Sequence, residues 1–233
     1  YKRQEWEKRI SVESLNSFVK SDGDGYVIVG KKSPSLFGWG DVFVIKIDGN
    51  GNKVWNVTFG GEGFDEGQDI IQTSDGGYAI VGTTTLYGSE DIWLINIDKN
   101  GNKRWDKIFE KRGSQEGRAI IQTFDGGYAI VGRTRSSEDS DWDVIVIKTD
   151  KYGNKEWEKV FGGEGFDDSN SIIQVSENKY VIGGTRENTQ SGEENIFVIK
   201  FYVTDASPIP DFNFILLFLA MMITSFIISL RKK

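Results

Sequence analysis

The chain has 233 residues, a formal net charge of −7, and neither cysteine nor histidine. Without these two residue types it has no disulfides, no Cys–His or Ser–His nucleophile pair, and none of the commonest transition-metal ligands. The acidic balance argues against a nucleic-acid partner, because binding to a phosphate backbone depends on Lys and Arg. Any chemistry must therefore depend on carboxylates, lysine, tyrosine or hydroxyls. The 28 glycines and the many aromatic and β-branched residues favour short strands joined by glycine turns.

An eight-residue motif organises the chain. DGGYAIVG occupies residues 75–82 and returns unchanged at 125–132, with looser copies at 23–30 (GDGYVIVG) and 177–184 (ENKYVIGG). A period near fifty residues indicates a repeat protein. The tyrosines of the four copies, spaced 52, 50 and 52 residues apart, are Tyr26, Tyr78, Tyr128 and Tyr180.

A tryptophan motif runs in phase with the first one. Each unit is predicted to form four strands, which in the second unit cover 69–73, 78–84, 91–98 and 103–109. SDGG joins the first pair of these strands and KNGN the last pair, and both are hairpin signals. Each unit is therefore expected to be a four-stranded antiparallel meander. The recurring tryptophans, predicted to pack between units, are Trp6, Trp55, Trp105 and Trp157.

The third strand of each unit is apolar on both alternating faces. In the first unit Phe43, Ile45 and Ile47 lie on one face, and Val42 and Val44 on the other. Burial on both faces is typical of blades packed between neighbouring blades, so we predict an all-β, β-propeller-like array. An open stack of sheets is the alternative. The four predicted units of about 50 residues are 11–59, 60–109, 110–161 and 162–203.

The repeats resemble the propeller repeats of PQQ-like quinoproteins and their relatives in archaeal and bacterial surface proteins. In that family a YxxG strand, a strand ending in Leu/Ile-Asp and a GxxxW strand follow one another. The resemblance covers roughly residues 1–203 and implies the fold more than an activity, since such repeats also occur in proteins without cofactor. Nothing in the chain matches the quinone-binding residues, so no cofactor is predicted.

The first residues offer a means of closing the ring. A lone tryptophan strand at 4–10 precedes the first unit, and the last unit lacks its own tryptophan strand. The strand at 4–10 is therefore a candidate to complete the fourth unit and remove its open edge. Further repeats upstream are the alternative explanation.

The last residues predict a membrane anchor. A linker at 204–211 contains two prolines, the uncharged apolar segment 212–230 is long enough to span a bilayer, and the basic residues 231–233 mark a cytoplasmic end. We therefore expect a single-pass protein of the cell membrane with its repeats outside. The tail resembles archaeal surface-protein sorting signals of the PEF/PGF type, although Asp211 stands where those signals carry Glu or Gly. Cleavage and retention of the tail both stay open.

The loops divide into a uniform end and a divergent end. Divergent loops such as 31–41, 83–91, 133–143 and 185–195 gather at one end of the meanders. They are either surface loops whose variation is merely tolerated or the place where a glycan or protein ligand binds. The residues proposed for this ligand face are Leu36, Phe37, Trp39, Tyr87 and Trp142. Weak calcium candidates at the same end are Glu62, Asp65, Asp167 and Asp168, for which capping of loop amides is the favoured role.

The sequence favours a membrane-anchored binding or cell-envelope scaffold without catalytic activity. The alternative is an extracellular carbohydrate-active enzyme that uses carboxylates. Such an enzyme needs two carboxyl groups roughly 5–10 Å apart in a central cleft. No acidic pair in the repeats stands out enough to nominate, and no catalytic or cofactor-binding residue is proposed.

Overall fold

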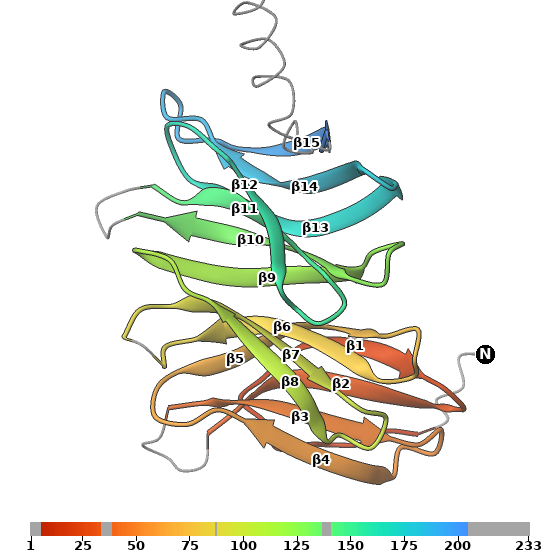
Figure 1. The fold of residues 1–233 in the computed structure, drawn as a ribbon. Coiled ribbons are helices and arrows are strands. Elements are labelled where there is room, and N and C mark those ends of the chain that lie inside the picture. The colour runs from red at the N-terminus through yellow and green to blue at the C-terminus, as the bar shows by residue number, and fades with distance from the viewer. Residues whose placement is uncertain (1–5, 34–38, 87, 137–140, 205–233) are drawn as a thin grey trace, which may run out of the picture. The chain divides into compact units, whose positions relative to one another are not determined.

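The structure of the protein is a computed structural model that describes residues 6–33, 39–86, 88–136 and 141–204. The chain divides into two compact units, Tyr1–Phe201 and Tyr202–Lys233. All described strands belong to the first unit, except that the last strand ends one residue beyond it, at Tyr202. Within the described ranges all regular structure is β-strand, in four antiparallel sheets (Figure 1). The predicted all-β repeat fold is therefore confirmed.

Each of the first three sheets is a four-stranded meander and the fourth has three strands. The first sheet contains β1 (Ser14–Ser21), β2 (Gly25–Lys32), β3 (Asp41–Ile47) and β4 (Lys53–Phe59). The second contains β5 (Asp65–Gln72), β6 (Tyr78–Thr84), β7 (Asp91–Ile97) and β8 (Lys103–Phe109). The third contains β9 (Ser114–Gln122), β10 (Tyr128–Arg135), β11 (Asp143–Thr149) and β12 (Lys155–Phe161). The fourth contains β13 (Asp167–Ser176), β14 (Lys179–Glu187) and β15 (Glu194–Tyr202).

Aspartate and glycine set the turns at the uniform end. In the turn between β3 and β4, Asp48 Oδ1 accepts the backbone N–H groups of Asn50 and Asn52 at 2.9 and 2.8 Å. Gly51 in that turn has a φ of 76°, which a side chain would disfavour. The same arrangement recurs at Asp98 and Asp150. These segments are hairpin turns, which explains why their sequences hardly vary.

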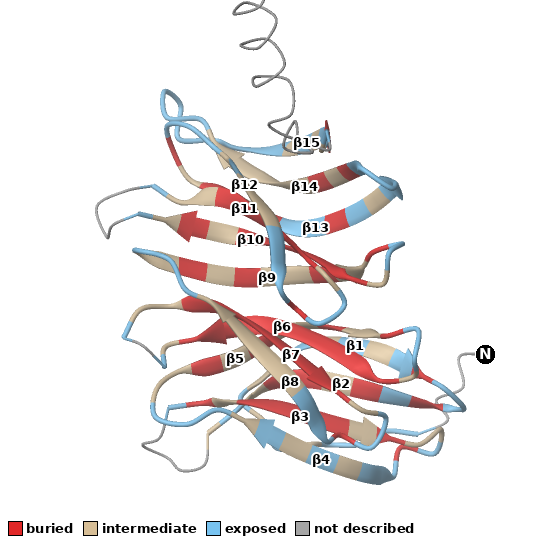
Figure 2. Cartoon of the chain, in the orientation of Figure 1, coloured by how far each residue is buried: buried red, intermediate tan, exposed pale blue. Residues whose placement is uncertain are grey.

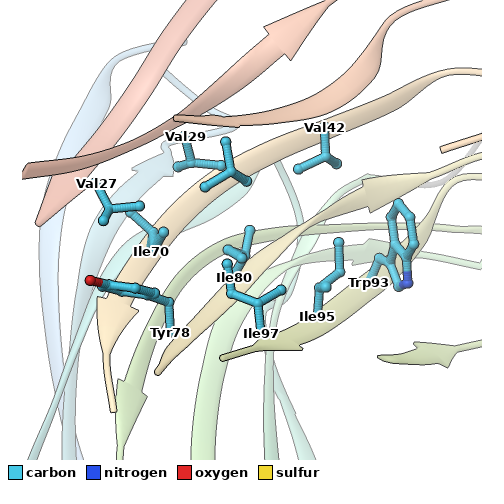
Figure 3. Packing of buried hydrophobic residues seen from close by; sticks show 10 residues of the cluster. Val27, Val29, Val42, Ile70, Tyr78, Ile80, Trp93, Ile95 and Ile97 are labelled. Carbon is cyan, nitrogen blue, oxygen red and sulfur yellow. The ribbon is translucent and has the colours of Figure 1, made fainter. Parts of the chain in front are cut away.

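The sheets pack face to face in chain order, with the first strands β1, β5, β9 and β13 of neighbouring sheets side by side. Figure 3 shows the first of these interfaces, where valines of β2 and β3 meet Ile80, Ile95 and Ile97 of the second sheet. Strands β6 and β7 are buried along their whole length (Figure 2). The predicted burial of both faces therefore holds for the inner sheets.

The N-terminal segment lies along the first sheet. Trp6 Nε1 donates to the Gly49 carbonyl at 2.9 Å, and Ile10 and Val12 pack against the apolar residues of β3. The fourth sheet ends at β15, to which no fourth strand is paired among the described residues. Ring closure by residues 4–10 stays a prediction.

The predicted membrane segment 212–230 and the sorting tail lie outside the described residues. Within the described ranges, no helix has the length and apolar character needed to cross a membrane.

Candidate functional site

A β-bulge recurs near the start of the first strand of every sheet. The pairing register shifts between Leu15 and Ser17 of β1, between Gly67 and Asp69 of β5, and at the equivalent places of β9 and β13. The glycine that closes each repeat motif makes this close approach feasible. At Gly82, for example, an added Cβ would overlap the backbone carbonyl of Glu66. A bulge re-aims the side chains beside it and increases the local twist.

The bulges bring one recurring position to the divergent end of the first strands. In β5, β9 and β13 this position holds Glu66, Glu116 and Asp168, which pair with Thr83, Arg133 and Thr185 of the second strands. In β1 the equivalent residue is Ser14, opposite Lys31. Because the first strands of neighbouring sheets lie side by side, three successive sheets contribute a carboxylate at the same level.

Two of these carboxylates share the same two arginines. Arg118 Nη2 lies 2.8 Å from Glu116 Oε2 and 3.7 Å from Asp168 Oδ2. Arg133 repeats the pattern, with Nη2 2.6 Å from Glu116 and Nη1 3.7 Å from Asp168. The two carboxylate oxygens at this nitrogen are thus no farther apart than about 7 Å, an upper limit that overlaps the separations that glycoside cleavage uses. Their side chains are largely buried, at 15% exposed for Glu116 and 25% for Asp168.

The two carboxylates differ in how well they are satisfied. Glu116 receives two close charge-assisted contacts from Arg118 and Arg133. Asp168 has only the two longer contacts, and its Oδ1 atom is buried without a hydrogen-bond partner. A buried carboxylate oxygen with no partner is costly in a purely structural role and needs an explanation.

A third carboxyl group enters from the loop between β6 and β7. The Glu90 carbonyl accepts the Gln115 N–H at 2.7 Å, which ties this loop to the start of β9. Burial, and next the neighbouring charge of Glu116, raises the pKa of Glu90, against the opposing effect of Arg135, Arg133 and Arg118. A carboxyl group that holds its proton longer than usual, next to a second carboxyl group, is the arrangement of an acid–base pair.

Trp142 completes the cluster from the loop before β11. Its carbonyl accepts the Asp167 N–H at 2.7 Å, as the Glu90 carbonyl does for the third sheet. The guanidinium carbons of Arg133 and Arg135 lie 4.4 and 4.7 Å from the centre of its ring. Trp142 thus orients Arg133 against Glu116 and Asp168 by cation–π contact.

Glu66 and Asp69 are held by polar groups of the first sheet. Glu66 Oε1 accepts the Ser14 hydroxyl at 2.8 Å and the Asn16 amide at 3.0 Å. Asp69 accepts the Ser17 hydroxyl at 2.7 Å and the backbone N–H of Ile120 at 3.0 Å, so it bridges the first strands of three sheets. These bonds align β1, β5 and β9 and keep the recurring carboxylate position in register.

Pairs of aspartates mark the inter-unit loops on the same end. Burial, and next the charge of Asp65, raises the pKa of Asp41. Asp143 has a raised pKa for the same two reasons, with Asp167 as its neighbour. Asp65 Oδ2 accepts the Gly61 N–H at 3.1 Å, which is the loop-capping role expected for it.

The calcium candidates face cations or backbone groups. Asp167 pairs with Arg186, and Asp168 lies against Arg118 and Arg133. Among the residues that the structure describes, no group of three or more acidic side chains is arranged to hold a metal ion.

The predicted ligand face is described only in part. Trp39 is 69% exposed, whereas Trp142 belongs to the carboxylate–arginine cluster. Leu36, Phe37 and Tyr87 lie outside the described residues. The expected packing anchors meet across the interfaces between sheets, with Trp55 against Tyr78 and Trp105 against Tyr128, at centroid distances of 6.3 and 5.9 Å. Trp157 contacts Tyr180 in the same way, while the partner of Tyr26 is Phe18.

Sequence reasoning missed the recurring carboxylate although its signal is present in the chain. The segments FDEG, SQEG and FDDS carry Glu66, Glu116 and Asp168 at the same place in three units. The statement that no acidic pair stands out is therefore wrong. All three stand seven positions after the phenylalanine that ends the preceding strand, so the alignment itself is direct. What the sequence does not show is the bulge beside each of them, which places them at one level. Glu90 has no such repeat signal.

The fold has known counterparts, although no protein-family model matches the chain and no curated protein is similar to it in sequence. It resembles an endo-arabinase from Bacteroides thetaiotaomicron with a TM-score of 0.53 and 9% identity, over 83% of this chain and 76% of that one. A GH43 beta-1,3-galactosidase gives a TM-score of 0.47 at 16% identity, over 76% and 40% of the two chains. An apocarotenoid oxygenase from Synechocystis gives 0.44 at 9%, over 80% and 50%. The first likeness shows a shared fold, and the other two are too weak to argue from.

The likeness to the endo-arabinase bears on the functional prediction. The sequence favours a scaffold without catalytic activity, and that prediction is wrong, because the matched fold is that of an enzyme and the bulges gather carboxylates at one end of it. The alternative, a carbohydrate-active enzyme, is the better supported of the two. The propeller-like architecture stands, while the link to PQQ-type repeats stays a prediction.

Proposed function

We propose that the protein is an extracellular glycoside hydrolase that uses carboxylates. The observation that carries the proposal is the position of Glu116 and Asp168 on the same Arg118 nitrogen, with Glu90 close enough to feel the charge of Glu116. Glycoside cleavage requires two carboxyl groups in unlike protonation states on either side of the scissile bond. The likeness to an endo-arabinase supports the fold that would carry such a site.

The environments of the three carboxyl groups suggest their roles. Glu90 has a raised pKa and donates its proton to the glycosidic oxygen as the bond to the anomeric carbon breaks. Asp168, whose side chain is 25% exposed, either takes a proton from the attacking water or attacks the anomeric carbon itself. Glu116 is held between Arg118 and Arg133, and its negative charge offsets the positive charges of these two arginines.

A panel of arabinans, galactans and aryl glycosides tests the proposal. We expect the full chain to release reducing sugar from at least one of them, and Asp168→Asn to lower the rate by about a hundredfold or more. Proton NMR of the first product would show whether the anomeric configuration is retained or inverted, which decides between the two roles of Asp168.

A matched control separates chemistry from surface charge. Glu164→Gln removes an exposed carboxylate from the inter-unit loop just before β13, so it should leave the rate unchanged. Turnover of every substrate at the rate of buffer alone, with intact folding by circular dichroism, would contradict the proposal.

We also propose that the enzyme works at the cell surface. The apolar segment 212–230, followed by basic residues 231–233, supports a C-terminal membrane anchor with the repeats outside. The PIPDF segment supports a sorting tail. Protease protection of residues 231–233 in intact cells, together with cleavage of the repeats, is the expected pattern. Cleavage of both parts from the same side would contradict a single span.

A further inference from the structure

Among the residues that the structure describes, the first and fourth sheets each have one apolar face on which no further sheet packs. On the fourth sheet this face carries Ile196 and Val198, which are 86% and 71% exposed, and β15 is pale blue along most of its length in Figure 2. On the first sheet it carries Leu15 and Phe18, 56% and 64% exposed. That face borders a groove of about 700 Å³, lined also by Tyr26 and Phe43. Apolar faces of this extent mark interaction surfaces.

The two faces are the halves of an interface that occurs three times inside the molecule. Ile196 and Val198 correspond in the repeat to Ile92 and Leu94, which are fully buried against the third sheet. Phe18 corresponds to Ile70, which is buried against the first sheet. The exposed face of the fourth sheet is thus the face that, in the inner sheets, packs on the next sheet of the chain. The exposed face of the first sheet is the one that, in the inner sheets, packs on the preceding sheet.

A pair of complementary substitutions links these faces to each other. At the inner interfaces a valine meets a small residue: a Cβ on Gly67 would overlap Val29, and one on Gly117 would meet Val81. On the fourth sheet the position of Val29 and Val81 is held by Gly183, and on the first sheet the position of Gly67 and Gly117 is held by Leu15. The large and small partners are exchanged. A Cβ on Gly183 would find only the Phe197 carbonyl, at 3.8 Å, so the space for Leu15 is open.

The N-terminal segment supplies what the fourth sheet lacks. At an inner interface Trp55 of β4 donates from Nε1 to the Lys99 carbonyl of the next sheet at 3.2 Å. Trp6 makes the equivalent bond to Gly49 at 2.9 Å, so it sits where the fourth strand of a preceding sheet would lie. A sheet docked on β1 and β2 would therefore bring the outer edge of its third strand beside this segment. In the fourth sheet that third strand is β15, and its outer edge is unpaired among the described residues.

We propose that the fourth sheet of one copy docks on the first sheet of a second copy, with Gly183 of one against Leu15 of the other. Both faces are open in the same chain, and the inner interfaces that separate them are filled with fully buried side chains that resist a change of angle. Docking of a second copy needs no such change. The contact is head-to-tail, so it builds closed rings or chains of copies.

Cysteine cross-linking tests the contact, because the native chain has no cysteine. Full-length chains carrying Leu15→Cys or Gly183→Cys, with different tags, are mixed in detergent and oxidised. The inner pair Gly67 and Val29 approaches closely enough for a disulfide at the equivalent positions. We expect a covalent heterodimer, and a much weaker one when Phe124→Cys, 68% exposed in the turn between β9 and β10, replaces Gly183→Cys.

Packing variants give an independent readout by sedimentation in the same detergent. Gly183→Val fills the space for Leu15 and should weaken association by about tenfold, since overpacking of this kind typically disrupts a close contact. Adding Leu15→Ser to Gly183→Val recreates the large–small order of the inner interfaces and should restore association. Monomers at all concentrations would overturn the proposal, as would an intrachain disulfide in the Leu15→Cys/Gly183→Cys double variant with no heterodimer in the mixture.

Discussion

Glu116 and Asp168 stand on the first strands of neighbouring sheets and contact the same Arg118 guanidinium nitrogen, at 2.8 and 3.7 Å. The contact exists because a bulge follows the same position in each first strand. The repeat therefore creates the candidate site. The bulge shapes the first strand of each sheet, and because three successive sheets carry an acidic residue beside it, their carboxylates come to the same level. Glu90 and the arginines are not repeated from sheet to sheet, and they determine the charge and the pKa values around the carboxylates.

Glu90 should control the alkaline side of the pH–rate profile. Burial and the charge of Glu116 raise its pKa, so the proton it donates is present at low pH and lost as the pH rises through that raised pKa. Activity should fall along the same limb. Glu90→Gln should lower kcat by about a hundredfold or more and remove the limb from the residual activity.

The same variant separates catalysis from stability. Because the folded state disfavours the ionised form of Glu90, Glu90→Gln should leave the melting temperature unchanged or higher above that pKa. Loss of activity with a falling melting temperature would indicate a structural role and contradict the assignment. Thermal unfolding of both proteins at one alkaline pH provides the measurement.

The glycine that closes each repeat motif should be needed for the site. A Cβ on Gly132 would overlap the carbonyl of Glu116, so Gly132→Ala must push β9 away and move Glu116 from Arg118. We expect a loss of about 1–3 kcal/mol in the free energy of unfolding, measured by urea titration. Gly163→Ala is the matched control, because nothing lies within 4 Å of its added Cβ. Equal effects of the two changes would show that the overlap is relieved without cost.

Much of the architecture could be predicted from the sequence, because hairpin turns and doubly apolar strands are local patterns. DGGYAIVG predicts the turn at Asp75 and the buried strand that follows it, and the structure contains both. The carboxylate cluster is different in kind. Glu116 and Asp168 are about fifty residues apart in the chain, and only the stacking of the sheets shows that they meet. The backbone bond at Glu90 recurs in the other units, but Gly40 and Trp142 hold its place there, so the repeat does not predict a carboxyl group at this position.

The tryptophan of each unit should stabilise the interface with the next sheet. Trp55 meets Tyr78 edge-on and donates to the Lys99 carbonyl, so Trp55→Phe loses that bond and part of the ring contact. We expect a decrease of about 1–2 kcal/mol in unfolding free energy. Trp39→Phe, at a position that is 69% exposed, should change it by less than about 0.5 kcal/mol. Similar values for both variants would contradict a role in packing between sheets.

The turn at Asp125 should make stability depend on pH in the acid range. Lys148 is only 3% exposed, and its Nζ atom lies 2.8 Å from both Asp125 and Glu156. Although burial acts to raise it, the hydrogen bonds from Lys148, Thr123 and Gly127 and the charge of Lys148 lower the pKa of Asp125 to about 2. The pKa is depressed in the folded state, so this stabilisation is complete above the ordinary pKa of aspartate and lost as the pH falls toward 2.

Urea unfolding of Asp125→Asn at several pH values measures this contribution. Since the Asp125 side chain is 56% exposed, solvent screening should reduce the contribution to about 1 kcal/mol. We expect Asp125→Asn to be less stable than the unmodified chain at pH 6 and equal to it near pH 2. Glu177→Gln, at an exposed turn residue, serves as the control and should not change the difference between the two pH values. A deficit that persists unchanged at pH 2 would mean that Asp125 acts through its hydrogen bonds to the turn and not through its charge.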